Sequence, residues 1–158
     1  MRLLADFMLG KLARELRLLG IDCAYEKDTD SYQLLKKAKS IGGVILTRNT
    51  KLKDKESVVF IKSEKVVEQI SQVLSVFANL TIRPMTRCLD CGTTLEARDK
   101  ASVKSKVPLY VYRTQERFYS CPSCQKIYWR GTHYEDMQRR VDQYLKIYSE
   151  IKGQKPNS

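Results

Sequence analysis

The sequence lacks both a long apolar run and a secretory signal. No stretch of the 158 residues approaches the about 20 consecutive apolar positions that a membrane-spanning helix needs, so we expect no membrane partner. The first residues carry an acid, Asp6, inside their apolar stretch and show no signal-cleavage pattern. We therefore expect a cytoplasmic protein, in a reducing compartment where cysteine thiols stay free for metal.

Acidic residues are also scarce relative to basic ones. The chain has 18 Asp and Glu against 29 Lys and Arg, a formal net charge of +11. This imbalance favours a polyanionic partner, above all nucleic acid, with solubility alone as the alternative. Hydrophobic and charged contents of 42% and 30% are typical of a globular protein, and the length suits one domain with a small added module.

Histidine is almost absent, since His133 is the only one. A fifth metal ligand and a general base are two roles open to it, but we favour a structural hydrogen bond at the start of a helix. Cysteine is not abundant either, with five in the chain. Cys23 lies in a largely apolar run and is interpreted as a small buried hydrophobe.

The remaining cysteines form two Cys-x-x-Cys pairs with residues 92–120 between them. Each pair places two thiolates on a tight turn, and two such turns brought together form a tetrahedral site that suits zinc. A closed four-thiolate site has no open position for substrate, which indicates a structural role. Two disulfides, or thiols without a partner, are the alternatives. The predicted zinc ligands are Cys88, Cys91, Cys121 and Cys124.

Strand-like and helix-like patterns alternate over residues 1–80. Strands are expected at 2–5, 22–25, 44–47 and 58–61, and helices where apolar positions recur along 9–19, 34–41 and 66–77. This alternation predicts an α/β fold, a parallel sheet with helices on both faces. Ligands of such sheets bind beyond the carboxyl ends of the strands.

Polar residues follow the predicted strand ends. Asp6, Asp28, Asp30 and Asn49 are the candidate catalytic residues, because acids that converge at a sheet edge can hold magnesium or manganese and activate a water for phosphodiester cleavage. The alternative is that Asp6, and Asp28 or Asp30, cap the helices that follow. Arg48 could contact a phosphate or pair with Asp6 or Asp30.

The composition changes near residues 83–84. We predict a sheet domain at 1–83, a β-rich zinc ribbon at 84–132 that includes a strand at 107–112, a helix at 133–152 that packs on the body, and a disordered tail at 153–158. Cations and aromatic rings alternate around the cysteine pairs, a combination expected of RNA binding. About half of these rings are needed to fill the ribbon core instead, an interpretation we favour for Trp129.

The candidate RNA-binding residues are the cations nearest these features. On the first helix, Lys11, Arg14 and Arg17 have the alternative of a solvated face, the usual meaning of such a run. The full candidate set is Lys11, Arg14, Arg48, Arg113, Arg117, Lys126 and Arg130.

Several motifs spread over about residues 2–140 occur together. They are Asp6-Phe7-Met8-Leu9-Gly10-Lys11-Leu12-Ala13-Arg14, Leu16-Arg17-Leu18-Leu19-Gly20, Asp28-Thr29-Asp30, Leu34-Leu35 with Ala38, Ile45-Leu46-Thr47-Arg48, the cysteine pairs, Pro108-x-Tyr110-Val111-Tyr112 and Tyr128-Trp129-x-Gly131-Thr132-His133. In this combination the chain resembles the Mut-seven C-terminal ribonuclease family, a PIN-like nuclease fold with an added zinc ribbon.

The resemblance implies metal-dependent RNA cleavage and an RNA partner, with ribosomal and transfer RNA as candidates. It makes Asp6 the first metal-binding carboxylate, and an acid near residues 28–31, with Asp30 as the candidate, the second. It also implies a third Asp after Thr47-Arg48, where this chain has Asn49, and often an acid where it has Ser31.

These departures leave more than one hypothesis. An Asn oxygen can coordinate magnesium but adds no negative charge, so the site is weaker; Asp54, five residues on, has a solvated surface role as its favoured interpretation. The leading hypothesis is a magnesium- or manganese-dependent ribonuclease. The first alternative is an RNA- or ribosome-binding protein that kept the fold and lost the chemistry. A module that binds a protein partner is the other.

Overall fold

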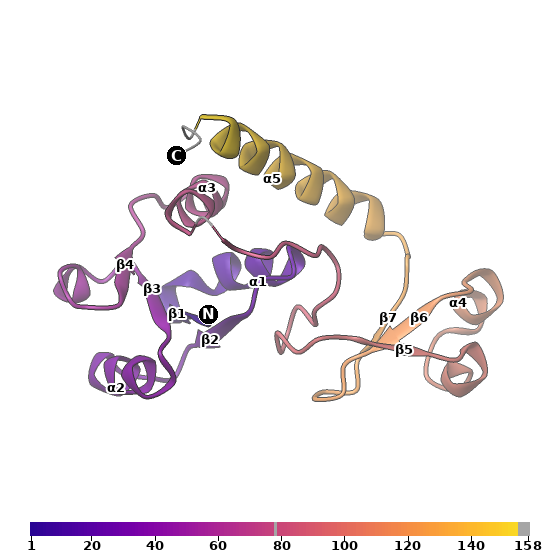
Figure 1. Ribbon diagram of the computed structural model, residues 1–158. Helices are drawn as coiled ribbons and strands as arrows, with labels where there is room; N and C mark the ends of the chain where they lie inside the picture. Colours follow the sequence, from indigo (N-terminus) through magenta and orange to yellow (C-terminus); the bar gives the residue numbers. More distant parts are fainter. Residues whose placement is uncertain (78, 155–158) are drawn as a thin grey trace.

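A computed structural model describes residues 1–77 and 79–154 and has an α/β architecture with two separate sheets (Figure 1). The larger sheet has the order β2-β1-β3-β4, and every neighbouring pair is parallel. Its strands are β1 (Leu3–Asp6), β2 (Cys23–Glu26), β3 (Val44–Thr47) and β4 (Val58–Phe60). The parallel sheet predicted from the alternating pattern is confirmed.

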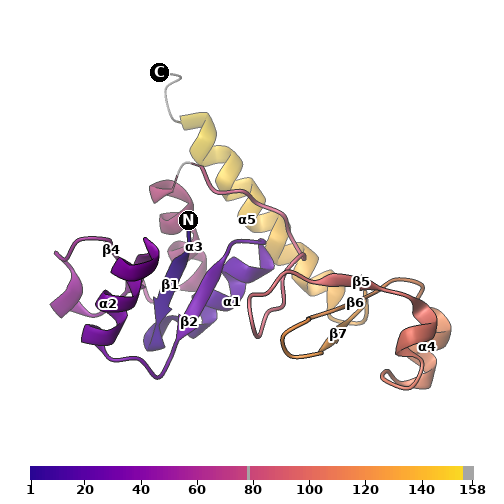
Figure 2. The ribbon, with the colours of Figure 1, turned by 60° about the horizontal axis from the view of Figure 1, so that its bottom comes forward.

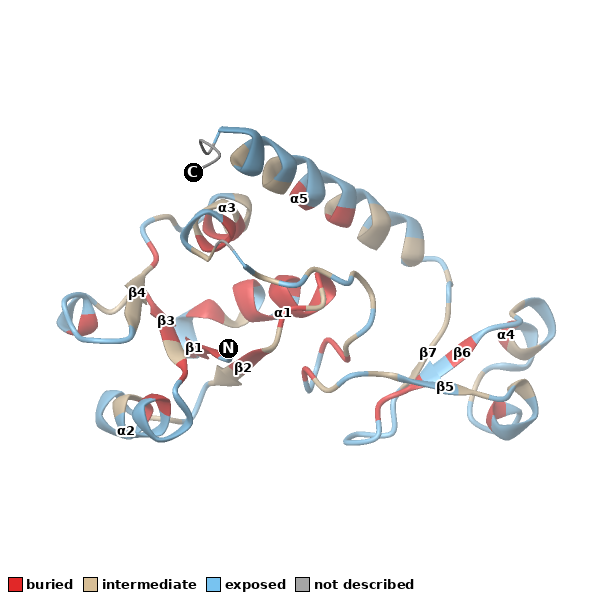
Figure 3. Ribbon diagram, in the orientation of Figure 1, coloured by how far each residue is buried: buried red, intermediate tan, exposed pale blue. Residues whose placement is uncertain are grey.

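Helices cover both faces of this sheet. The side chains of β1 alternate, with Leu3 and Ala5 in the core beneath α1, α3 and α5 and Leu4 in the smaller core beneath α2. The buried residues follow these two layers (Figure 3). The helices are α1 (Gly10–Leu18), α2 (Ser31–Ile41), α3 (Val66–Val76), α4 (Leu109–Thr114) and α5 (Tyr134–Gln154), with 3-10 turns at Phe7–Leu9, Thr50–Leu52 and Lys100–Val103.

The smaller sheet belongs to the ribbon and is antiparallel, in the order β5-β6-β7. Phe118 of β6 is buried with Val103 and Val111, and Ile127 and Trp129 pack against this cluster. Trp129 is partly buried against this cluster, which agrees with its predicted place in the ribbon core. The strands are β5 (Glu96–Arg98), β6 (Phe118–Ser120) and β7 (Ile127–Tyr128).

The strand predicted at 107–112 is wrong, because this segment enters helix α4. Pro108 stands at the helix N-cap, where its missing N–H costs no hydrogen bond, and its carbonyl accepts from Tyr112 N at 3.0 Å. Val111, the buried residue of this helix, packs with Val103 and Phe118 and fixes the helix to the ribbon core. Figures 1 and 2 both show α4 at the end of the ribbon farthest from the parallel sheet.

The ribbon is joined to the sheet domain through the turn after α1. Arg83 N donates to Leu19 O at 3.0 Å and Met85 N to Leu18 O at 2.9 Å, so the linker runs along this turn. Gly20 permits the approach, since it has φ +80 and a Cβ there would lie 2.1 Å from the Arg83 oxygen. The backbones at this junction can touch only because residue 20 has no side chain.

Helix α5 crosses the molecule and packs on the sheet domain beside α3 and α1 (Figure 2). The Glu15 carboxylate, 5% exposed, accepts from Arg140 Nε at 2.7 Å and from the Tyr144 hydroxyl at 2.9 Å. The helix continues through Gln154, two residues into the segment expected to be a tail, and residues 155–158 lie outside the described part. No helix in the described ranges is both long and apolar enough to cross a bilayer.

Candidate functional site

Asp6 lies at the carboxyl edge of the parallel sheet and is held there by hydrogen bonds to both of its carboxylate oxygens. It ends β1 and is 5% exposed. Its Oδ1 accepts from Met8 N at 3.1 Å, as a helix cap, and its Oδ2 accepts from the Thr47 hydroxyl at the end of β3. The capping role considered for Asp6 is therefore present, and the same carboxylate also joins two adjacent strand ends.

Asn49 extends this group by one step. Its backbone N–H donates to Thr47 Oγ1 at 2.9 Å, and its Nδ2 donates to Ser31 Oγ at 3.3 Å. Its Oδ1 accepts from Lys51 N at 3.0 Å, so it caps the 3-10 turn that follows. The structure thus brings Asp6, Thr47, Asn49 and Ser31 into one hydrogen-bonded chain, which we call the acidic edge.

The other predicted acids, Asp30 and Asp28, take no part in this chain of hydrogen bonds. Asp30 is exposed and forms a capping box with Gln33 at the start of α2, with Gln33 N donating to Asp30 Oδ1 at 2.8 Å. Asp28 is exposed in the loop before it. Within the described ranges, no three of these acids lie close enough together to hold one metal ion. The group of potential metal ligands that does converge in those ranges is the four-cysteine cluster.

Glu26 is an edge carboxylate that the sequence did not single out. It ends β2 in register with Asp6. Burial opposes its ionisation, but hydrogen bonds from Lys37 and Thr29 outweigh burial and lower the pKa of its carboxyl below 4.5. Its position as the last residue of a strand was the signal that could have identified it.

Arg48 pairs with neither Asp6 nor Asp30, contrary to one of the two roles considered for it. Its Nη1 donates to Ile61 O at 2.9 Å, and its Nη2 lies 3.9 Å from the exposed Glu64 carboxylate. The guanidinium therefore reaches across from the end of β3 to the segment after β4, where it is bonded to a backbone carbonyl.

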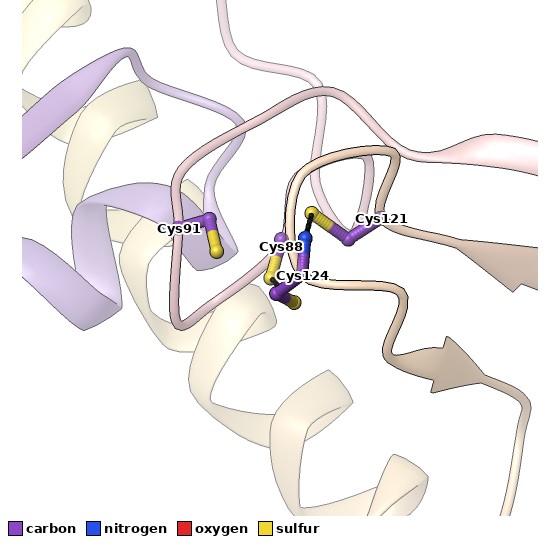
Figure 4. A group of neighbouring side chains, drawn as sticks. All are labelled: Cys88, Cys91, Cys121 and Cys124. Atoms are coloured by element: carbon purple, nitrogen blue, oxygen red, sulfur yellow. Dashed lines mark hydrogen bonds between the residues drawn. The ribbon is translucent and has the colours of Figure 1, made fainter.

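The four predicted zinc ligands converge from two loops of the ribbon (Figure 4). Their sulfur atoms all lie within 4.8 Å of one another, and those of Cys88 and Cys124 are 3.8 Å apart. Four thiolates at about 2.3 Å from a tetrahedral ion have sulfur atoms about 3.8 Å apart, so the donor set can hold a metal such as zinc. All five cysteines are free, so the disulfide alternative is not realised.

The two cysteine turns have the same backbone form. Gly92 N donates to Cys88 O and Gln125 N to Cys121 O, both at 2.8 Å. Gly92 and Gln125 both have left-handed backbone, with φ of 78 and 67. Gly92 also faces Arg17, whose Nε would lie 2.9 Å from an added Cβ. The first turn therefore needs glycine for two reasons, and the second tolerates glutamine.

Backbone hydrogen bonds favour the thiolate form of one ligand, Cys121. Burial opposes ionisation of Cys121, but the N–H groups of Ser123 and Cys124 donate to its Sγ, and the pKa of the thiol falls from 9.0 to about 7. The Tyr128 hydroxyl lies 3.1 Å from Cys88 Sγ. Burial instead raises the pKa of Cys23 to about 12, so this thiol stays neutral, as expected of a buried hydrophobe.

His133 does not join either centre. It is exposed and precedes α5, where its backbone carbonyl accepts from Met137 N at 3.1 Å. The four-thiolate group in the described chain does not include it. His133 therefore lies at the start of a helix, as predicted, and takes part in the helix hydrogen bonding through its backbone carbonyl.

The basic residues of α1 do not form one solvated face. Arg17 is 6% exposed, and its guanidinium donates to the carbonyls of Cys23, Leu89 and Asp90 at 2.9–3.0 Å. Arg14 pairs with the Asp90 carboxylate at 2.9 Å. These contacts fasten the first cysteine turn to α1, a structural role that the local sequence did not predict.

The remaining candidate RNA-binding cations have different surroundings. Lys126 lies 3.1 Å from Asp90, opposite Arg14. The others are exposed and form no ion pair with a described carboxylate: Lys11, Arg113, Arg117 and Arg130.

Comparison with known proteins agrees with this arrangement of sheet domain and ribbon. A family model described as the Mut7-C RNAse domain matches residues 1–141. A search of curated proteins and a search of solved structures each returned no match. Because the matched residues cover most of the chain, this protein belongs to the Mut7-C RNase domain family.

Proposed function

We propose that this protein is a ribonuclease that hydrolyses RNA phosphodiesters with the help of a divalent cation at the acidic edge. The observation that carries the proposal is the buried Asp6 carboxylate, placed where two adjacent parallel strands end and joined to Thr47 and Asn49. A ligand site is expected beyond such strand ends. The family makes RNA the substrate or partner.

The donor chemistry at this edge suits magnesium or manganese in kind. Asp6, Asn49 and Ser31 offer carboxylate, amide and hydroxyl oxygens, and Asp30 starts the adjacent helix. A bound ion there would supply an activated water and stabilise charge on the phosphate. The chain's own residues position it: Thr47 holds Asp6, and the Asn49 side chain is oriented through Ser31 and Lys51.

For the ribbon, we propose zinc as the metal, with a structural role. Four thiolates match its preference, and the closed set has no position for substrate. The exposed Arg113, Arg117 and Arg130, together with Lys11, give RNA phosphates their contacts on this protein.

The test is cleavage of labelled single-stranded and structured RNAs with magnesium or manganese. Asp6→Asn should abolish cleavage, since it removes the buried carboxylate of the acidic edge. Glu150→Gln, at an exposed glutamate of α5 outside the acidic edge, should leave the rate unchanged. Circular dichroism checks that both variants fold. Absence of cleavage with any divalent ion, in wild type and in Asn49→Asp, would exclude the proposal.

One observation favours a second candidate, an RNA- or ribosome-binding protein without catalysis. Asn49 stands where the resemblance implies a third Asp, and no three carboxylates of the described residues lie close enough together to hold one ion. If the wild type binds RNA without cleaving it and Asn49→Asp restores cleavage, this candidate is correct.

A further inference from the structure

A cavity of about 880 Å³ lies where the sheet domain, the linker and the ribbon meet. Its walls come from the turn after α1, residues 79–87, the ribbon sheet and the start of α5. The family match and the acidic edge assign nothing to this cavity, which we call the junction cleft.

The junction cleft is distinct from the acidic edge. Ile21 and Asp22, which line it, come just before β2, whereas Asp6 comes at the end of β1. In a parallel sheet these positions belong to opposite edges. Each of the two strands is 4 residues long, which separates the edges by about 13 Å at a rise of about 3.3 Å per residue.

Aromatic rings form one wall of the cleft. Tyr119 and Tyr128 are directly paired across β6 and β7, so their side chains stand next to each other on one face of the ribbon sheet. Phe118 and Ile127 pack into the ribbon core instead. Tyr119 is 36% exposed and lines the cleft with Tyr128 and Trp129. The open face of the small sheet is therefore aromatic.

Cations stand beside these rings. Arg83 and Arg130 line the cleft and form no ion pair with a carboxylate of the described chain. The Arg130 guanidinium lies 5.0 Å from the centre of the Tyr134 ring, which holds it at the rim. Asp22, the acid among the lining residues, lies 3.7 Å from Arg2 and 3.9 Å from Arg87. The wall thus combines stacking surfaces with unpaired positive charge.

We propose that the junction cleft binds single-stranded RNA, with an unpaired base stacked on Tyr119 and its phosphates against Arg83 and Arg130. Aromatic faces stack on bases of any sequence, and arginines neutralise the phosphates between them. The inference rests on RNA as the partner of this protein and adds the substrate class: RNA with an unpaired segment. Binding there holds a strand at the edge of the sheet opposite the acidic edge.

The experiment measures binding of a fluorescein-labelled eight-residue oligouridine and of a fully paired RNA duplex. It uses the full chain loaded with zinc, in the Asp6→Asn background. No magnesium or manganese is added, so that cleavage does not interfere. Tyr119→Ala should weaken oligouridine binding about tenfold, the typical loss of one base–aromatic contact. Tyr119→Phe should bind within about twofold of the parent, because it keeps the ring.

Tyr110→Ala is the matched control. Tyr110 is a more exposed tyrosine of the same ribbon, 67% exposed on α4, and does not line the cleft. Its variant should bind as the parent does. Trp129, the one tryptophan of the chain, lines the cleft and reports occupancy directly, so oligouridine should quench its fluorescence with the affinity seen by anisotropy.

The inference would be overturned by equal losses from Tyr119→Ala and Tyr110→Ala, or by oligouridine binding without any change at Trp129. Either leaves the proposed ribonuclease activity intact, because cleavage is assayed separately through Asp6. If the duplex bound as tightly as oligouridine, recognition of an unpaired base would also be rejected. No binding of either RNA would reject this inference, while the cleavage assay would still decide the proposed function.

Discussion

The cysteine cluster and the acidic edge are both groups of residues that can bind a metal. They differ in how far hydrogen bonds within the chain already stabilise their ligand atoms. In the cluster, the chain gives hydrogen bonds to Cys121 and places the Tyr128 hydroxyl at Cys88, but all four sulfur atoms still face one another within 4.8 Å. At the acidic edge, both Asp6 oxygens and the Asn49 side chain already have hydrogen-bond partners within the chain. Convergent thiolates without a cation repel one another, whereas a satisfied carboxylate does not.

From this difference we expect the fold to require the proposed zinc, and only the proposed chemistry to require the divalent ion at the acidic edge. The ribbon has a small core, built around Phe118, Val103 and Val111, so we expect it to depend on zinc for stability. The sheet domain has a large two-sided core and an edge held by its own hydrogen bonds. The acidic edge should therefore keep its structure with or without a divalent ion.

Removal of the ribbon metal should have the largest effect. Cys124→Ser takes one thiolate from the cluster, and structural zinc contributes about 10–16 kcal/mol to folding. We expect the variant to lose zinc and the ribbon to unfold, while the sheet domain keeps its circular dichroism. Zinc content and Trp129 fluorescence measure the two effects.

Cys23→Ala is the control for this comparison, because Cys23 is a buried neutral thiol outside the cluster. It should keep one zinc per chain. A ribbon that stays folded in Cys124→Ser without metal would contradict the contrast drawn between the two centres.

Loss of the link between the two regions should have the next largest effect. Arg17→Met removes three hydrogen bonds from a buried guanidinium to the carbonyls of Cys23, Leu89 and Asp90. Bonds to charged groups contribute about 1.5–3 kcal/mol each and are not additive, so we expect a loss of about 3 kcal/mol in the free energy of unfolding by urea. Arg14→Met removes a half-exposed ion pair and should cost less than about 1 kcal/mol. Equal losses would show that Arg17 has no special place at the junction.

The elements with a strong local signal could be predicted from the sequence. The parallel strands follow from alternation with helices, and the cysteine cluster follows from two Cys-x-x-Cys pairs. Helix α4 could not, because Val107 to Tyr112 is β-branched and aromatic, and its helical state depends on Pro108 at the N-cap and on the tertiary contact of Val111.

Local sequence patterns could not predict polar contacts between residues far apart in the chain. The spacing of Lys11, Arg14 and Arg17 suggests one solvated face, yet Arg17 is buried because the first cysteine turn, 72 residues away at Leu89, supplies carbonyls to it. At the acidic edge, strand ends placed Asp6 and Asn49 at the same side of the sheet. They could not show that Thr47 joins them.

A smaller effect is expected from adding charge to the acidic edge. Asn49→Asp keeps an oxygen for Lys51 N and places a second carboxylate beside Asp6. We expect manganese to bind about tenfold more tightly, or ~1.4 kcal/mol, because solvent screens much of the added attraction. Isothermal titration measures it, and Asn79→Asp, an exposed asparagine at the opposite edge, controls for net charge. Equal gains in both variants would mean that no specific ion site exists at Asp6.

The smallest effect is expected at Glu26, the edge carboxylate whose charge is already paired with Lys37. Its pKa is lowered in the folded chain, so its contribution is present above its unfolded pKa, near 4.5, and is lost as the pH falls through the lower folded pKa. Glu26→Gln should therefore lower the free energy of unfolding by about 0.5–1 kcal/mol at pH 7, since Lys37 is half exposed, and by nothing once the pH is below the folded pKa. Urea unfolding across this range, with the exposed Glu56→Gln as control, separates the Lys37 pair from general charge. A difference that persists at low pH would show that Glu26 acts through packing, and the acidic edge would then be less self-sufficient than its hydrogen bonds indicate.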